Sequence, residues 1–189
     1  MSRIVVTEFM SLDGVMEDPG GAEGTEHGGW TFKFERGPEG GKFKVDELMS
    51  ADALLLGRVT YQAFAAAWPS MGGDEFGERM NRVPKYVVSS SLKDAEATWG
   101  DTTVLRGDVV AEITRLKSEP GGDLLVEGSS QLVHTLAENG LVDEYRLMVF
   151  PIILGSGKRV FPDADAMAEL SLTTHAVEGG TLLLTYQPS

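Results

Sequence analysis

Residues 53–60 read ALLLGRVT, and this stretch decides the fold. Four consecutive apolar residues predict a short strand that is buried on both faces. The apolar side chains from Tyr61 to Trp68 then recur with helical spacing, and Pro69 ends that helix. A buried strand that turns directly into an amphipathic helix is the repeating unit of a parallel α/β sheet.

The same alternation extends along the chain in both directions. Helical spacing also predicts helices at residues 42–51, 74–81, 109–116 and 132–136. Period-two alternation around Gly179 and Gly180 predicts a closing antiparallel hairpin at 170–177 and 181–186. Runs of apolar and β-branched residues predict further strands at 3–9, 85–89, 102–105, 123–126 and 144–150. We therefore expect one α/β domain over residues 1–189, with a mixed, mainly parallel central sheet.

The amino-acid composition excludes several classes of binding partner and of chemistry. The chain has 189 residues, 42% of them hydrophobic, which suffices for one full core. Its 16 basic and 29 acidic residues give a net charge of −13, which disfavours nucleic acid and anionic membranes as partners. Cysteine is absent, which excludes disulfides and thiolate metal sites. The three histidines have no metal-ligand spacing, so we expect no metal.

The apolar runs of the sequence bear on where the protein is located and on whether it forms oligomers. The apolar start is interrupted at Glu8, unlike a signal peptide, and the apolar run 147–154 is far shorter than the ~20 residues that span a bilayer. We expect a cytoplasmic protein. The run 147–154 and the final hairpin are more apolar than one small sheet needs, which favours a homodimer.

Small and hydroxyl-bearing residues follow three predicted strands. They are Gly57-Arg58-Val59-Thr60, Ser89-Ser90-Ser91 and Gly128-Ser129-Ser130. Each has an ordinary interpretation as a helix cap, a solvated Arg or a loop. Together, in an acidic chain, they favour a dinucleotide, because glycine lets backbone approach phosphate and helix starts offer free N–H groups. The Gly-x-Gly-x-x-Gly, P-loop and Gly-x-Ser-x-Gly patterns are all missing.

Three other residues have two interpretations each. Asp13 either forms an Asp-Gly turn or faces the pocket, where it binds substrate or supplies a proton. Glu127 either accepts hydrogen bonds from a polar substrate or caps backbone N–H groups. Trp30 either covers a flat ligand or belongs to the core.

These motifs together resemble one family. Ser11-Leu12-Asp13-Gly14, Trp30, the segment 52–60, Val126-Glu127-Gly128 and the segment 151–157 look like the reductase domain of the bacterial bifunctional riboflavin biosynthesis protein. That domain has the three-layer dihydrofolate reductase-like fold, and this chain is similar to its stand-alone members. The resemblance implies NADPH as cofactor and reduction of a phosphoribosylamino-pyrimidine.

The resemblance also implies roles for residues. Asp13 and Glu127 would face the substrate, and Asp13 would be catalytic. The residues that would hold the cofactor are Trp30, Gly57, Arg58, Thr60, Ser89, Ser90, Gly128, Ser129, Ser130, Gln131, Leu132, Leu154 and Gly155. The substrate half departs from the family, because Gly28 stands where the family has a substrate-binding Ser and Leu48 where it has an Arg.

We therefore expect an NADPH-dependent reductase acting on a small polar, heterocyclic substrate. Two alternatives remain open: a nucleotide-binding module without turnover, and an interaction protein with an empty pocket.

Overall fold

The computed structural model describes residues 1–161 and 167–189, arranged around one eight-stranded sheet with the order β4-β3-β2-β5-β1-β6-β8-β7. The strands are β1 (Arg3–Ser11), β2 (Ala51–Gly57), β3 (Lys85–Val88), β4 (Thr102–Leu105), β5 (Asp123–Glu127), β6 (Glu144–Phe150), β7 (Leu170–Glu178) and β8 (Thr181–Pro188). The helices are α1 (Gly37–Ser50), α2 (Arg58–Ala67), α3 (Glu75–Arg82), α4 (Val109–Ser118) and α5 (Ser130–Glu138).

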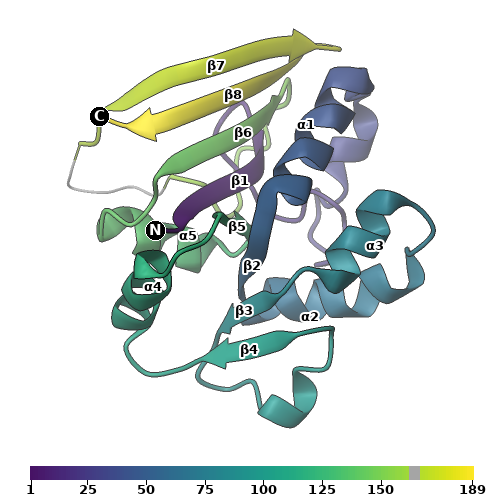
Figure 1. Cartoon of the computed structure of the whole chain (residues 1–189). Coiled ribbons are helices and arrows are strands. Elements are labelled where there is room, and N and C mark those ends of the chain that lie inside the picture. The colour runs from purple at the N-terminus through teal and green to yellow at the C-terminus, as the bar shows by residue number, and fades with distance from the viewer. Residues whose placement is uncertain (162–166) are drawn as a thin grey trace.

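The sheet is parallel except at the end formed by the last two strands. β1 pairs in parallel with β5 and β6, and β2 with β3 and β5, whereas β8 pairs antiparallel with β6 and β7. Helices α1, α2 and α3 lie on one side of the sheet and α4 and α5 on the other (Figure 1). The predicted three-layer α/β architecture, with its closing hairpin, is confirmed.

Strand β2 is buried on both faces, as the run of apolar residues predicts. Leu54 and Leu56 pack with residues of α1, α2 and α3, whereas Ala53 and Leu55 pack with residues of α4 and α5. Full burial of a leucine side chain contributes about 1.5–3 kcal/mol to folding. Residues 53–56 therefore join the two halves of the core.

Helix α1 begins earlier than the predicted range 42–51. It starts at Gly37, with a proline in its first turn, where the missing N–H costs nothing. The carboxylate of Glu178, on β7, accepts a hydrogen bond of 2.7 Å from the backbone N–H of Glu39. This partner is 139 residues away in sequence, so the helix start depends on a tertiary contact that periodicity does not show.

Parallel pairing brings several strand ends to one edge of the sheet. Gly57 at the end of β2 pairs with Val88 of β3, and Leu55 of β2 pairs with Val126 of β5. The turns that follow β2, β3 and β5 therefore start side by side. In the described part of the chain, no helix has the length and apolar character that crossing a membrane requires.

Candidate active site

The turns after β2 and β5 are in direct contact. The backbone N–H of Gly57 donates to the Oγ of Ser129 at 2.8 Å, and that hydroxyl donates to the Oγ1 of Thr60 at 3.0 Å. A side chain at position 128 would place its Cβ 3.0 Å from the Thr60 Oγ1. Glycine at 128 therefore lets the two turns pack against each other.

Backbone conformation at this contact is unusual. Gly128 has φ 57° and Ser129 has φ 63°, so two consecutive residues are left-handed. A left-handed serine costs about 1 kcal/mol or more, and such conformations persist where surrounding contacts hold them. Here the bonds from Gly57 and to Thr60 hold Ser129, and the turn opens directly into α5.

The start of α5 offers backbone donors. The first N–H groups of a helix have no acceptor within the helix, which here concerns Ser130 and Gln131. The N–H of Leu132 already donates to the Ser129 carbonyl at 2.8 Å, and the Leu132 side chain is in the core. The helix and the core therefore use the N–H group and the side chain of Leu132, and its expected contact with a cofactor stays a prediction.

Arg58 and the serines after β3 lie at the same edge. Arg58 is exposed at the first turn of α2 and donates to the Gln62 side chain at 2.8 Å, so its guanidinium can turn to another partner. The Oγ of Ser89 accepts the N–H groups of Ser91 and Leu92, and Ser90 is exposed. Thr60 is the third residue of α2, and its hydroxyl accepts a hydrogen bond from Ser129 rather than capping the helix.

Asp13 ties two loops together. Its carboxylate accepts the Ser11 hydroxyl at 2.6 Å and the backbone N–H groups of Leu154 at 3.1 Å and Gly155 at 2.8 Å. Partial desolvation opposes ionisation, but these hydrogen bonds outweigh it and lower the pKa of Asp13 to about 2. At neutral pH the group is an ion with several donors already bound. This geometry supports the turn-forming interpretation and disfavours a proton donor.

Trp30 is a core residue. Its side chain is 0% exposed, its indole N–H donates to the Glu17 carbonyl at 2.8 Å, and its ring meets Phe150 edge-on. This burial supports the interpretation of Trp30 as a core residue, and its expected contact with a cofactor stays a prediction. An aromatic in a glycine-rich loop gives no sequence signal that separates the two roles.

A buried cluster of charges lies beside the turn after β5. Lys44 of α1 forms an ion pair with Glu47 of the same helix, and its Nζ lies 3.4 Å from the Oε1 of Glu127 and 3.1 Å from the hydroxyl of Thr7. Glu127 was expected to face the substrate; Lys44 and Glu47 were not foreseen. The one sequence signal is a Lys and a Glu three residues apart on α1, which is common on helix surfaces.

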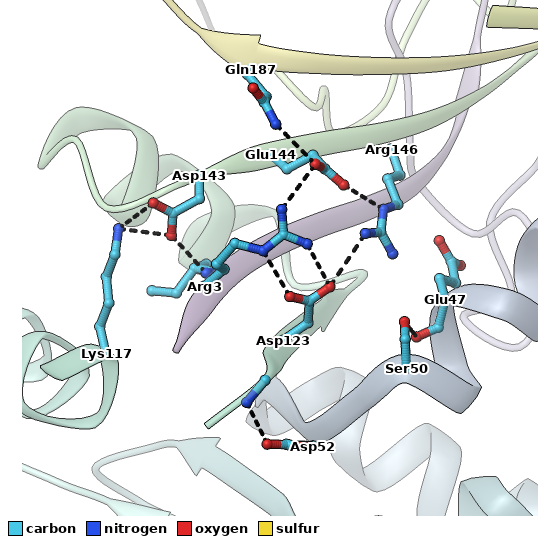
Figure 2. A network of polar contacts seen from close by, with 12 residues as sticks. Arg3, Glu47, Ser50, Asp52, Lys117, Asp123, Asp143, Glu144, Arg146 and Gln187 are labelled. Carbon is cyan, nitrogen blue, oxygen red and sulfur yellow. Dashed lines mark hydrogen bonds and ion pairs between the residues drawn. The ribbon is translucent and has the colours of Figure 1, made fainter. Parts of the chain in front are cut away.

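Another charged network occupies the opposite edge, at the amino ends of the strands. Arg3 lies between Asp123 and Glu144, and Arg146 contacts the same two carboxylates (Figure 2). Across residues 1–161 and 167–189, no three His, Asp or Glu side chains are placed to hold a metal ion.

The chain was compared with known proteins. It is 26% identical to the uncharacterized protein YyaP of Bacillus subtilis (strain 168), over 97% of this chain and 94% of YyaP. A crystal structure described as a riboflavin biosynthesis protein from Shewanella sp. PV-4 superposes with a TM-score of 0.77 at 19% identity, covering 99% of each chain.

A dihydrofolate reductase from Enterococcus faecalis, complexed with NADP(H), has a TM-score of 0.60 at 17% identity, over 98% of this chain and 96% of the enzyme. These structural matches establish a dihydrofolate reductase-like fold. The sequence model of the RibD C-terminal domain matches residues 2–184. The chain therefore belongs to the RibD C-terminal domain family.

Proposed function

We propose that the protein is an NADPH-dependent reductase that delivers hydride to a small, polar, heterocyclic substrate. The observation that carries this proposal is the contact between the turns after β2 and β5, with the start of α5 beside them. Family membership supports an oxidoreductase in general.

The residues present fit a dinucleotide diphosphate. Gly128 lets the turn after β5 pack closely against Thr60, the first N–H groups of α5, at Ser130 and Gln131, have no acceptor within the helix, and Arg58 is an exposed cation at the start of α2. The dihydronicotinamide of such a cofactor supplies hydride. The protein orients the two reactants and stabilises charge.

The residues at the two positions where the family binds its substrate favour a substrate other than a phosphoribosyl compound. Leu48, at the position of the family's Arg, is 0% exposed and packs in the core. A side chain on Gly28 would overlap the Asp18 carboxylate, so the family's Ser does not fit there. The same two positions motivate the second candidate, a nucleotide-binding module without turnover.

The test uses NADPH fluorescence and the variant Arg58→Ala. Wild-type protein should bind NADPH, and the variant should bind it about tenfold more weakly, with a smaller loss for NADH, because the guanidinium fork matches a phosphate. Arg115→Ala is the matched control, since Arg115 is an exposed arginine on α4 and pairs with Glu112 and Glu119.

Each outcome decides between the candidates. Equal losses for the two cofactors would remove the proposed contact between Arg58 and the extra phosphate. Binding of NADPH without its oxidation, across a panel of pterins and aminopyrimidines, would favour the binding module. An absence of binding at millimolar NADPH would discard both.

A further inference from the structure

Six residues of the β7–β8 hairpin share one face of the sheet, because the register of the two strands places them directly opposite one another. They are Leu172, His175 and Val177 of β7 and their partners Tyr186, Leu184 and Leu182 of β8. We call these six residues the hairpin face. The three β8 residues pack against the part of the core that contains α4 and α5, whereas Leu183 packs on the other side of the sheet, with Phe43 of α1.

Exposure on this side of the sheet increases from strand to strand towards its edge. The β6 residues that lie beside the hairpin face, Tyr145, Leu147 and Val149, are at most 5% exposed. The β8 residues of the face are partly buried, whereas on β7 Leu172 is 48% and Val177 is 66% exposed. In the described part of the chain, the layer formed by α4 and α5 therefore ends before β7 (Figure 1).

The alternation of side chains in β7 is the reverse of what a single copy needs. An edge strand normally turns its apolar residues towards a covering layer and its polar residues towards water. In β7 the small and polar residues Thr174, Ala176 and Glu178 lie on the side of α1, and the apolar residues lie on the side without a helix. Burying the hairpin face therefore requires a layer that the described residues do not supply.

The hairpin face is extended and carries no carboxylate. β7 has nine residues and β8 has eight, so the two strands present a surface of roughly 30 by 10 Å. Exposed apolar surfaces of this order mark interaction sites on soluble proteins. The chain has 29 acidic residues, yet none of them belongs to the face. Glu178, the acid of β7, turns its carboxylate to the backbone N–H of Glu39 in α1.

Charge selects a second copy of the chain as the partner. Two molecules that each carry −13 repel each other, so they can meet only where neither presents carboxylates. A basic partner would find no carboxylate on this face to attract it, and an anionic membrane would be repelled by the acidic molecule. In a two-fold pair the same surface patch of each copy meets the other, so an uncharged apolar face is complementary to itself.

We propose that the protein is a homodimer in which the hairpin faces of two copies pack against each other. The two sheets then stack face to face, about 10 Å apart, as in a β-sandwich. Pairing through the free edge of β7 would instead leave both hairpin faces in water. The sequence favoured a homodimer from the run 147–154 and from the hairpin; the strand residues 147–150 are buried within one copy, whereas the hairpin face is not.

The test measures mass by sedimentation equilibrium for two substitutions on the same strand. Wild-type protein at micromolar concentration should have twice the 20.4 kDa mass of one chain. Val177→Asp places a carboxylate in each hairpin face and should raise the dissociation constant about a hundredfold, because like charges then meet in an apolar interface. Thr174→Asp is the matched control: it adds the same charge to β7 on the other face, so it should remain a dimer.

A third variant, Val177→Lys, separates burial of the face from repulsion between acidic molecules. Lysine makes the chain less acidic, so repulsion alone would let this variant associate at least as well as wild type. Burial of the face predicts weaker association, by about tenfold, because the ammonium must lose water or reach the rim of the interface. Urea unfolding in a single transition shows that each variant is folded. If Val177→Asp does not fold, Val177→Lys carries the same test.

Several outcomes would overturn the inference. A wild-type mass of one chain would leave the hairpin face to a different partner. Dimers of Val177→Asp or Val177→Lys as tight as those of wild type would place the interface elsewhere. Dissociation of Thr174→Asp to the same extent as Val177→Asp would indicate pairing through the free edge of β7. NADPH binding is a separate measurement: a dimer that does not bind NADPH would refute the reductase and leave this interface.

Discussion

The two edges of the sheet treat buried charge in opposite ways. At the amino ends of the strands, two arginines face two carboxylates: Arg3 donates twice to Asp123 at 2.9 Å, and Arg146 donates to Glu144 at 2.7 Å (Figure 2). At the carboxyl ends, Lys44 forms ion pairs with both Glu47 and Glu127. A buried carboxylate bonded by arginines keeps its charge at low cost, whereas a buried carboxyl group without a full set of partners is destabilised as an ion.

The largest expected effect is at the amino-end network. Asp123→Asn removes one of the two carboxylates that Arg3 and Arg146 share, and both Asp123 and Arg146 are largely buried, at 10% and 15% side-chain exposure. Breaking a buried pair from one side typically costs 3–5 kcal/mol, and the partial exposure of Arg3 places this case near the lower end, at about 3 kcal/mol. Urea unfolding measures the free energy directly.

Asp94→Asn is the control, because that side chain is 83% exposed in its pair with Arg106 and should matter by less than about 0.5 kcal/mol. NADPH affinity of the folded Asp123→Asn protein should equal that of wild type. A loss of stability below about 1 kcal/mol, or a changed affinity, would contradict the structural role given to this edge.

The sequence predicts those features of each end of the strands that depend on neighbouring residues in the chain. Residues 102–105 and 144–150 were predicted with the observed bounds, and the burial of residues 53–56 was correct, because local composition carries that information. Contiguous motifs also identified the turns at 57–60 and 128–130, which the structure brings into contact.

The charge cluster could not be predicted in the same way. Its members come from positions 7, 44, 47 and 127, on three elements that only the folded sheet brings together. The start of α1 and the burial of Trp30 likewise depend on contacts distant in sequence. One hint was present locally: Glu8 places a charged residue in the middle of a strand that is otherwise mostly apolar from Ile4 to Met10.

We expect a smaller change in the free energy of unfolding at Glu8, and here the substitution should stabilise the protein. Its pKa is raised in the folded state by burial and by the Glu127 carboxylate, against Lys44. Stability from the protonated group is therefore present below its unfolded pKa and is lost as pH rises through the folded value. Glu8→Gln cannot ionise, so near pH 8 it should be more stable than wild type by about 1 kcal/mol, the size typical of single substitutions.

Chemical unfolding at a series of pH values measures that difference. The advantage of Glu8→Gln should shrink as pH falls and vanish near pH 4, about where an unfolded glutamate also becomes protonated. Glu112→Gln, at an exposed pair on α4, should show no such trend. A constant difference at all pH values would mean that Glu8 is not the group that carries the buried excess of acid.

The smallest effect is expected at Asp13, the acid at the carboxyl edge that is already bonded. Asp13→Asn weakens the acceptors for the N–H groups of Leu154 and Gly155. Asp13 is partly exposed, so solvent screening limits the loss to about 0.5 kcal/mol at pH 7. Because the pKa of Asp13 is lowered to about 2, its stabilisation is present above its ordinary pKa and is lost as pH falls toward 2.

Unfolding of Asp13→Asn at pH 7 and at about pH 3 tests this, with Asp108→Asn as the control, because asparagine replaces aspartate at a helix cap with little change. If Asp13 acts as a loop anchor, NADPH affinity and NADPH oxidation should both survive the substitution. If oxidation is abolished while binding and stability are intact, Asp13 contacts the substrate. Asp13, an acid that is already fully hydrogen-bonded, would then also belong to the substrate site. In that case, the difference in charge pairing between the two ends of the strands would not show where the substrate binds.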